Sequence, residues 1–445
     1  MVGAELLEMR LLRDIYSQRQ LEAVMTDFWL NHFNVYLRKN QNEPYLLPSY
    51  EREAIRPHAL GRFEDLLVAT AKSPAMLVYL DNVQSIGPGS IAAERVARLK
   101  ERAPDANVAR VLPNGLNENY ARELMELHTL GVKGGYTQAD VTQVAKVFTG
   151  WTAEQPVRGG EFQFEERRHE PGSKTVLGVK IRENGEREGL EVLHMLATNP
   201  ATARFLSTKL AVRFVSDTPP AALIDRMSKA YLSSDGDIAT VLRTMFESPE
   251  FWSLEVYRAK IKTPIEFVVS AARATDADVV NPLSLVRALD KLGMPLYGMQ
   301  TPNGYSWTAE PWVSTGALVS RMNFAVALSS NRIPGTFVDW NALLQQSPSV
   351  QPIAADAPAK EDRLEKLLLG QPASEQTRAA VTREVDGQAS QAQAEKEFSI
   401  HHRDVEPMLA VLNASGLTTP VRPPQDHDSA MMAGLLLGSP EFQRR

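Results

Sequence analysis

Many of the residues that could do chemistry lie in one short stretch, NENYARELMELHTLGVKGGYTQAD, at residues 117–140. A helix over its first half places Asn119, Glu123 and Glu126 on one stripe, at i, i+4 and i+7. His128 follows shortly after Glu126. Two carboxylates that face the same way, with an imidazole close by, could act as general acid and base or could bind a metal ion.

Spacing alone leaves three interpretations of this polar stripe open. Arg122 lies one turn from both Glu118 and Glu126, so the stripe fits a solvent-exposed helix face with i,i+4 ion pairs. It also fits a buried Arg–Glu network that holds helices in register. The third interpretation is a functional cluster, in which Glu123, Glu126 and His128 are weak candidates for metal ligands.

Two further pairs of polar residues lie in surroundings that suggest enclosure or a pocket rim. Asn31 and His32 lie among the aromatic residues of MTDFWLNHFNVY, where a core histidine is the plainer interpretation and a site is the alternative. His169 and Lys174 lie in the loop HEPGSKT, which fits a pocket rim as well as it fits a plain solvated turn.

Asp81 and Asn82 form an adjacent polar pair just before a segment rich in glycine, proline and charge. Their short side chains could cap a helix or line a cleft, and capping is the expected role.

The composition of the 445-residue chain excludes several classes of protein. Apolar residues make up 43% and charged residues 23%, which is ordinary for a globular protein with a large core. The net charge of −6 and the lack of a basic stripe predict no nucleic-acid partner. The absence of cysteine removes disulfides, thiolate catalysis and cysteine-ligated zinc. No apolar run approaches the length of a transmembrane segment.

The common nucleotide-binding and hydrolase motifs are absent from the sequence, including G-x-G-x-x-G, the P-loop, G-x-S-x-G and H-E-x-x-H. The E-x-x-H at Glu191 and His194 lacks the second copy and the further glutamates that a helical di-metal site needs. The cofactor, if there is one, is therefore unassigned.

The elements that must position these residues are predicted to be mainly α-helical. Apolar residues recur at helical spacing, and Ser-Pro or Asn-Pro marks helix junctions at Ser73, Asn199, Ser248 and Ser439. The strings EFQFE and KTVLGVKI predict a small β-hairpin near residues 160–182. We therefore expect an irregular multi-helical body with capped helix–proline junctions and a small hairpin insertion.

Three segments are predicted along the chain. Residues 1–330 form the helical domain, residues 331–427 an Ala/Gln/Pro-rich, partly helical and mobile extension, and residues 428–445 a helix that docks back on the body. Within the first segment we assign Trp252 to the core. The loop PLYGMQTPNGYSWTAEPW carries aromatic residues that either cover a ligand or another domain or simply pack.

Several strings of the sequence carry a resemblance to a known family, and NENYARELMELHTLG is highly specific. The others include MTDFWLNHFNVY, IRPHALGRFEDLL, SPAMLVYLDN, HEPGSKTVLG, PATARFLSTKLAVRFV, KTPIEFVVSA and the terminal LGSPEFQRR. In this order they resemble the bacterial domain of unknown function 1800. The family has no known reaction to carry over.

The resemblance implies a shared polar cleft, because the family pattern holds a set of polar residues where this chain has them. These are Asn31, His32, Asp81, Asn82, Asn119, Arg122, Glu123, His128, His169 and Lys174. Genes of the family often lie beside those of an alkaline-phosphatase-like or sulfatase-like family, which implies a protein partner. Family members usually begin with a helical segment containing a phrase like LLNRATFGP. This sequence lacks that phrase, so we expect the family's N-terminal segment, with any signal peptide, to be missing.

Two hypotheses for function follow. The first is a helical scaffold or accessory protein that binds a partner protein through the polar cleft, with Glu126 among the binding residues, and through the aromatic loop. The alternative is a metal-assisted hydrolase with Glu123, His128 or His169 as the catalytic candidates. The compartment is not assigned from the sequence.

Overall fold

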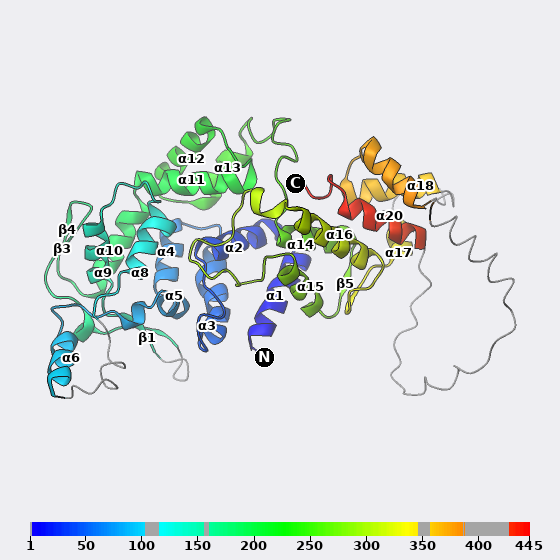
Figure 1. The fold of residues 1–445 in the computed structure, drawn as a ribbon. Helices are drawn as coiled ribbons and strands as arrows, with labels where there is room; N and C mark the ends of the chain where they lie inside the picture. The colour runs from blue at the N-terminus through cyan, green and yellow to red at the C-terminus, as the bar shows by residue number, and fades with distance from the viewer. Residues whose placement is uncertain (1, 103–114, 155–159, 346–356, 386, 388–426) are drawn as a thin grey trace, which may run out of the picture. The chain divides into compact units, whose positions relative to one another are not determined.

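The computed structural model describes residues 2–102, 115–154, 160–345, 357–385, 387 and 427–445. The described chain is mainly helical, and its short strands form small two-stranded antiparallel sheets (Figure 1). The predicted fold class is therefore confirmed.

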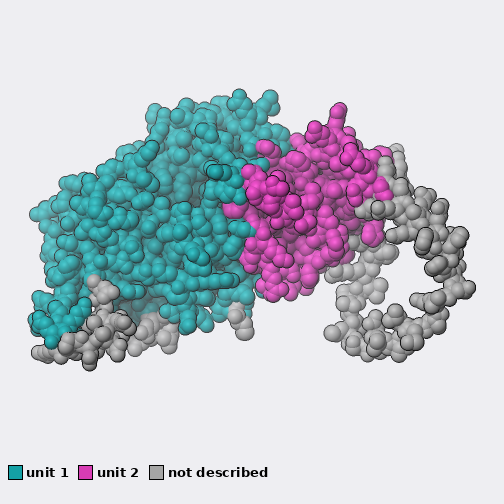
Figure 2. Space-filling view, viewed as in Figure 1, with its two compact units in different colours: residues 1–261, 293–311 teal, residues 262–292, 312–445 magenta. Residues whose placement is uncertain are grey.

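The chain divides into two compact units (Figure 2). Unit 1 comprises residues 1–261 and 293–311, and unit 2 comprises residues 262–292 and 312–445. The boundary predicted at residue 330 therefore falls inside unit 2. Much of the predicted mobile extension, at residues 346–356, 386 and 388–426, lies outside the described residues.

Unit 1 consists mainly of short α-helices connected by tight turns. The α-helices are α1 (Val2–Tyr16), α2 (Gln20–His32), α3 (Glu43–Ser49), α4 (Phe63–Ala71), α5 (Pro74–Tyr79), α6 (Ile91–Arg102), α8 (Asn119–Glu123), α9 (Gln138–Val147), α10 (Glu186–Ala197), α11 (Pro200–Phe214), α12 (Ala221–Ser233) and α13 (Ile238–Phe246). The 3-10 and π-helical segments are η1 (Tyr50–Ile55), η2 (Arg56–His58), η3 (Asn82–Gln84), η4 (Leu124–Thr129) and η6 (Glu166–Arg168). Helices α11, α12 and α13 pack in sequence order, side by side (Figure 1).

The core of unit 1 contains a cluster of aromatic rings from α2 and α4. Trp29 on α2 and Phe33, which directly follows α2, are fully buried and pack against Phe63 at the start of α4. The indole N–H of Trp29 donates to the Ala59 carbonyl oxygen at 2.9 Å, so the polar group of this buried ring has a hydrogen-bond partner. The predicted aromatic run therefore forms core, as its burial pattern requires.

Among the described residues of unit 1, the named strands form two separate pairs. Strands β3 (Lys174–Val176) and β4 (Val179–Ile181) form the hairpin predicted within residues 160–182. The string EFQFE contributes β2 (Phe162–Phe164), which pairs with β1 (Trp151–Ala153) and not with KTVLGVKI.

The proline junctions behave differently from one site to the next. Asn199 caps α11 through its side chain, which accepts the Ala201 N–H at 2.8 Å, and Pro200 is the first helical residue. Helix α5 also starts at its proline, but the Ser73 hydroxyl makes no cap hydrogen bond. Ser248 and Ser439 each accept a backbone N–H three residues ahead, and a turn follows them instead of a helix.

Unit 2 contains the following elements: α14 (Pro264–Ala274), β5 (Asp278–Val279), α15 (Leu283–Lys291), α16 (Thr315–Ser329), β6 (Thr336–Phe337), α17 (Trp340–Gln345), α18 (Ala357–Leu364), η8 (Glu365–Leu369) and α20 (His427–Gly438). Helix α14 starts with a capping box, in which Thr263 and Glu266 exchange side-chain and backbone hydrogen bonds. Helix α20, the predicted C-terminal helix, packs along α16.

Candidate functional site

The central polar helix changes its winding halfway along. It starts at Asn119 as α8 and continues from Leu124 as the π-helix η4. The Leu130 N–H donates to the Met125 carbonyl oxygen, and the Thr129 hydroxyl donates to the Leu124 carbonyl oxygen at 2.6 Å. Short π-helical segments are costly in backbone geometry and occur often at functional sites. No local signal in the sequence predicts this change, because the run has ordinary helical composition.

The first half of this helix presents an ion-paired network. Arg122 donates to Glu118 at 3.2 Å and to Gln138 at 3.0 Å. Glu118 also accepts from Gln138 and Thr142. These groups are partly exposed, so Arg122 tethers α8 to α9 at its surface and contributes little free energy as an ion pair. Asn119 is exposed and uses its backbone N–H to donate to Asn117.

The two carboxylates of the predicted stripe have different surroundings. Glu126 accepts a hydrogen bond from the Tyr136 hydroxyl at 3.3 Å. Glu123 is half-buried, and burial, together with the negative charge of Glu126, raises the pKa of its carboxyl while Arg122 acts to lower it. A carboxyl with a raised pKa keeps its proton to a higher pH than an ordinary carboxyl, which favours a role as general acid.

His128 and His32 form a buried pair. His32 Nε2 lies 3.1 Å from the His128 carbonyl oxygen, and because that oxygen can only accept, Nε2 carries the proton. His128 Nε2 and His32 Nδ1 are buried and have no hydrogen-bond partner among the described residues. Burial, assisted by the charge of Lys209, lowers the pKa of His128 to about 3 and that of His32 well below its ordinary value. Both rings are therefore neutral near pH 7.

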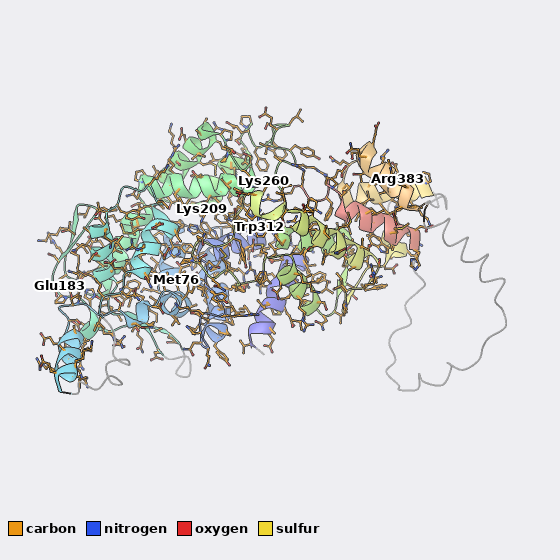
Figure 3. The ribbon with its side chains drawn as sticks, in the orientation of Figure 1. Met76, Glu183, Lys209, Lys260, Trp312 and Arg383 are labelled. Carbon is orange, nitrogen blue, oxygen red and sulfur yellow. The ribbon has the colours of Figure 1, made fainter. Side chains whose placement is uncertain are left out.

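Lys209 (labelled in Figure 3) is the cation of this region, and it comes from α11. Its side chain is half-buried, and burial lowers its pKa to about 8. Its ammonium lies 5.4 Å from the centre of the Phe205 ring, a cation–π distance, and makes no ion pair among the described residues.

His169 and Lys174 belong to a second buried cluster, which is completed by Glu188 on α10. Glu188 Oε1 lies 3.0 Å from His169 Nε2, and Glu188 Oε2 lies 2.7 Å from Lys174 Nζ. On the other side of its ring, His169 Nδ1 donates to the Thr149 carbonyl oxygen at 2.8 Å. Burial acts to raise the pKa of Glu188, but the bonds from His169 and Lys174 outweigh it and lower the pKa.

The asparagines of the predicted set tie backbone segments together. The Asn31 side chain forms two hydrogen bonds with the Tyr305 backbone: it donates to the carbonyl oxygen at 2.9 Å and accepts from the N–H at 2.7 Å. Asn82 is buried and donates to the carbonyl oxygens of Phe148 and Trp151. Asn31 lines a cavity of only about 20 Å³, which has room for about one water molecule.

Asp81 does not take the capping role expected for it. Its backbone is left-handed, with a φ of 59°, and its carboxylate pairs with Lys39 at 2.9 Å. Its side chain makes no cap hydrogen bond to η3, the segment it precedes, so the expectation of capping is not met.

The structure distributes the predicted residues over separate clusters. His32 lies against His128, and His169 lies against Lys174, but no ring contact, ion pair or hydrogen bond among the described residues joins His169 to either of the other histidines. A single recess that contains all of them stays a prediction. The described residues also contain no group of three or more His, Asp or Glu side chains placed to hold a metal ion.

The sequence analysis did not single out three charged residues that are buried or half-buried in unit 1. Glu188 and Glu43 are fully buried, and Lys209 is half-buried. Both carboxylate oxygens of Glu43 are buried without a hydrogen-bond partner in the described chain, and burial raises its pKa to about 8. For Glu188 a signal existed, because it lies one helical turn before the apolar Val192 and so falls on the buried face of α10.

Among the aromatic residues singled out from the sequence, Trp252 differs from expectation. In the predicted aromatic loop, Tyr297 and Trp307 are buried, and Trp307 stacks on Phe28 at 6.1 Å between ring centres. Trp252, which we assigned to the core, is 74% exposed. That assignment was wrong because the segment after α13 forms a series of turns on the surface and not another core helix.

These features define a mainly helical protein that builds its polar residues into small, separate clusters, two of them buried. Over the described residues, every helix is too short or too polar to cross a membrane. Residues 2–444 match the model of the family described as a protein of unknown function (DUF1800), and the chain belongs to this family. Neither the curated proteins nor the solved structures contain a match to it.

Proposed function

We propose that this protein is a helical scaffold or accessory protein that works by binding a partner protein. The observation that carries the proposal is an exposed apolar segment in the turns between α13 and α14. Trp252 is 74% exposed and Leu254 is 92% exposed, with Tyr257 also exposed nearby. Large apolar side chains gathered in one surface segment are typical of an interaction site.

The Trp252 ring is held in place although it is exposed. Its indole N–H donates to the Phe246 carbonyl oxygen at 2.7 Å, and its ring meets Phe251 edge to face at 5.3 Å. A tryptophan fixed before binding loses little conformational entropy on association, which is how binding hot spots are built.

Several of the polar residues that a catalytic cleft would need have structural partners instead. Asn31 and Asn82 hold backbone carbonyl groups, and His169 and Lys174 are paired with Glu188. We therefore move the partner-binding surface from the aromatic loop, where Trp307 is buried, to residues 252–257. The partner we propose is the phosphatase-like or sulfatase-like protein that the family resemblance implies.

The test is co-expression of this chain with the product of the adjacent gene, followed by co-purification and measurement of the dissociation constant. We expect wild-type protein to retain the partner and the double variant Trp252→Ser, Leu254→Ser to bind it at least about tenfold more weakly. The matched control is Tyr45→Ser, which removes an equally exposed aromatic ring elsewhere in unit 1. Failure of the wild type to retain the partner, or equal retention by the double variant, would contradict the proposal.

The second candidate function is a hydrolase that uses Glu123 as general acid or base, and the raised pKa of Glu123 is the observation that favours it. The test combines metal analysis of the purified protein with ester and phosphate-ester assays of Glu123→Gln and His128→Ala. Loss of turnover in Glu123→Gln, with turnover kept in the exposed control Glu183→Gln, would support this candidate. No bound metal and no change in either variant would remove it.

A further inference from the structure

Unit 2 contains a cavity of about 510 Å³ that has no role in the clusters described above. It is lined by residues of α15, of α16 and of the segment that follows α16. The volume lies within the range of about 300–1,000 Å³ that is typical of small-molecule sites.

The charged side chains that line this cavity are all cationic: Arg287, Lys291 and Arg332. Among the residues that the structure describes, no aspartate or glutamate lines it, although the chain as a whole has a net charge of −6. Within the described part of the chain, none of the three cations makes an ion pair or a side-chain hydrogen bond. A concave surface with one sign of charge concentrates its field and attracts ions of the opposite sign.

Two of these cations share one helix face at a cost to the helix. Arg287 and Lys291 are four residues apart on α15, where like charges repel each other. The opposite face of α15, with Leu285 and Leu289, is buried in the core of unit 2. The helix is therefore fixed by its apolar side while its cationic side faces the cavity.

The third cation is positioned by a clamped turn. Asn331 ends α16 in a left-handed conformation, with a φ of 53°. Its side-chain Nδ2 donates to the Val338 carbonyl oxygen at 3.0 Å, and its side-chain Oδ1 accepts the Val338 N–H at 2.7 Å. These two hydrogen bonds to Val338 fix the segment that brings Arg332 to the cavity.

We propose that this cavity binds a small phosphate monoester. The guanidinium groups of Arg287 and Arg332 present paired N–H donors that match phosphate oxygens, and a phosphate dianion offsets more of the cationic charge than a carboxylate does. The rest of the ligand meets an apolar wall that includes Leu292, Phe324 and Ile333. A compact apolar or aromatic body therefore fits beside the phosphate group.

The experiment is isothermal titration of the full chain with phenyl phosphate, inorganic phosphate and benzoate at constant ionic strength. We expect phenyl phosphate to bind most tightly, and benzoate to bind at least about tenfold more weakly because it has one negative charge and no tetrahedral oxygens. Raising the salt concentration from about 50 to about 300 mM should weaken binding, because the cations are exposed to solvent.

The decisive variant is the double substitution Arg287→Gln, Arg332→Gln, which should weaken binding of phenyl phosphate by at least about tenfold. The matched control is Arg383→Gln, which removes the same charge from an exposed arginine of unit 2 that does not line the cavity (Figure 3). Both positions of the double variant are on the surface, and an unchanged melting temperature will show that it folds.

Three results would overturn the proposal. They are no binding of phenyl phosphate by the wild type, equal binding by the double variant, and an equal loss in Arg383→Gln. Vesicles of phosphatidylcholine with phosphatidic acid form a separate arm of the experiment. Binding to these vesicles without binding of phenyl phosphate would assign the site to a lipid headgroup and overturn the soluble ligand.

Discussion

Glu188 shows how a single buried charge connects distant parts of unit 1. It pairs with Lys174 on β3, faces His169 after η6, and accepts the Asn184 N–H at 2.9 Å. A buried charge is tolerated only when it is paired and hydrogen-bonded, and the cost appears when one partner is removed. The cluster therefore fixes the β3–β4 hairpin to α10.

The substitution Glu188→Gln should lower the free energy of unfolding by about 3–5 kcal/mol, because it leaves the buried Lys174 ammonium without its carboxylate. Chemical denaturation at pH 7 measures the difference. The control is Glu183→Gln (Figure 3), which removes the same charge at an exposed position and should change the stability by about 0.5 kcal/mol or less. Similar losses in the two variants would contradict a structural role for the buried cluster.

Wild type and Glu188→Gln can also be compared as a function of pH. The pKa of Glu188 is lower in the folded chain than its ordinary value, so the ionised carboxylate stabilises the fold at neutral pH. That stabilisation is present above the unfolded pKa and is lost as the pH falls through the lower folded value. The difference in unfolding free energy between wild type and Glu188→Gln should therefore shrink as the pH is lowered below about 4.5.

At the scale of single elements, packing decides where a helix tolerates change. Gly189 on α10 lies directly against the Trp151 ring of β1, where an added Cβ atom would overlap the indole. Gly316, in the first turn of α16, has nothing within 4 Å of the position of an added Cβ. Both glycines lie in helices, so intrinsic propensity alone predicts that alanine stabilises each of them.

We expect the two alanine substitutions to have opposite effects. Gly189→Ala should destabilise the protein by about 1–3 kcal/mol, because the steric cost exceeds the gain in helix propensity. Gly316→Ala should stabilise it by about 0.5 kcal/mol. Thermal unfolding of the two variants beside wild type measures both effects, and stabilisation by Gly189→Ala would disprove the close contact between α10 and Trp151.

At the scale of the whole molecule, unit 2 is made of two separate stretches of chain that its C-terminal residues connect. Arg321 on α16 is buried, and burial lowers its pKa to about 10. Its guanidinium donates to Gln443 and to the Lys262 carbonyl oxygen, each at 2.8 Å. Phe442 packs against Phe267 and lies under the Lys262 ammonium. The end of the chain therefore closes the core of unit 2.

Removal of residues 442–445 should destabilise unit 2 by about 3–5 kcal/mol, because a buried phenylalanine is lost and Arg321 loses a partner. Hydrogen exchange will show the effect as lost protection in α14 and α16, with α11–α13 of unit 1 unchanged. The control removes only residues 444 and 445 and should have a small effect. Equal loss of protection in both units would contradict the closing role of the C-terminal residues.

Local signals in the sequence were enough to predict the helical class and several helix starts. The Thr137–Asp140 capping box is formed as the string TQAD predicts, and Asn199-Pro200 starts α11. The hairpin at β3–β4 follows from the β-branched residues on either side of a tight turn. Each of these features depends on residues within a few positions of one another, so a short stretch of sequence is enough to predict it.

The sequence by itself therefore determined the mainly helical class, the resemblance to a family and many of the residues with chemical potential. Only the tertiary structure decided how those residues are used. In the folded chain Glu188 pairs with Lys174, Trp252 is exposed, Trp307 is buried, and three cationic side chains line one cavity. The physical reason is that burial, and with it the pKa and the partners of a charged group, is set by contacts between segments far apart in the chain, which helical spacing does not encode.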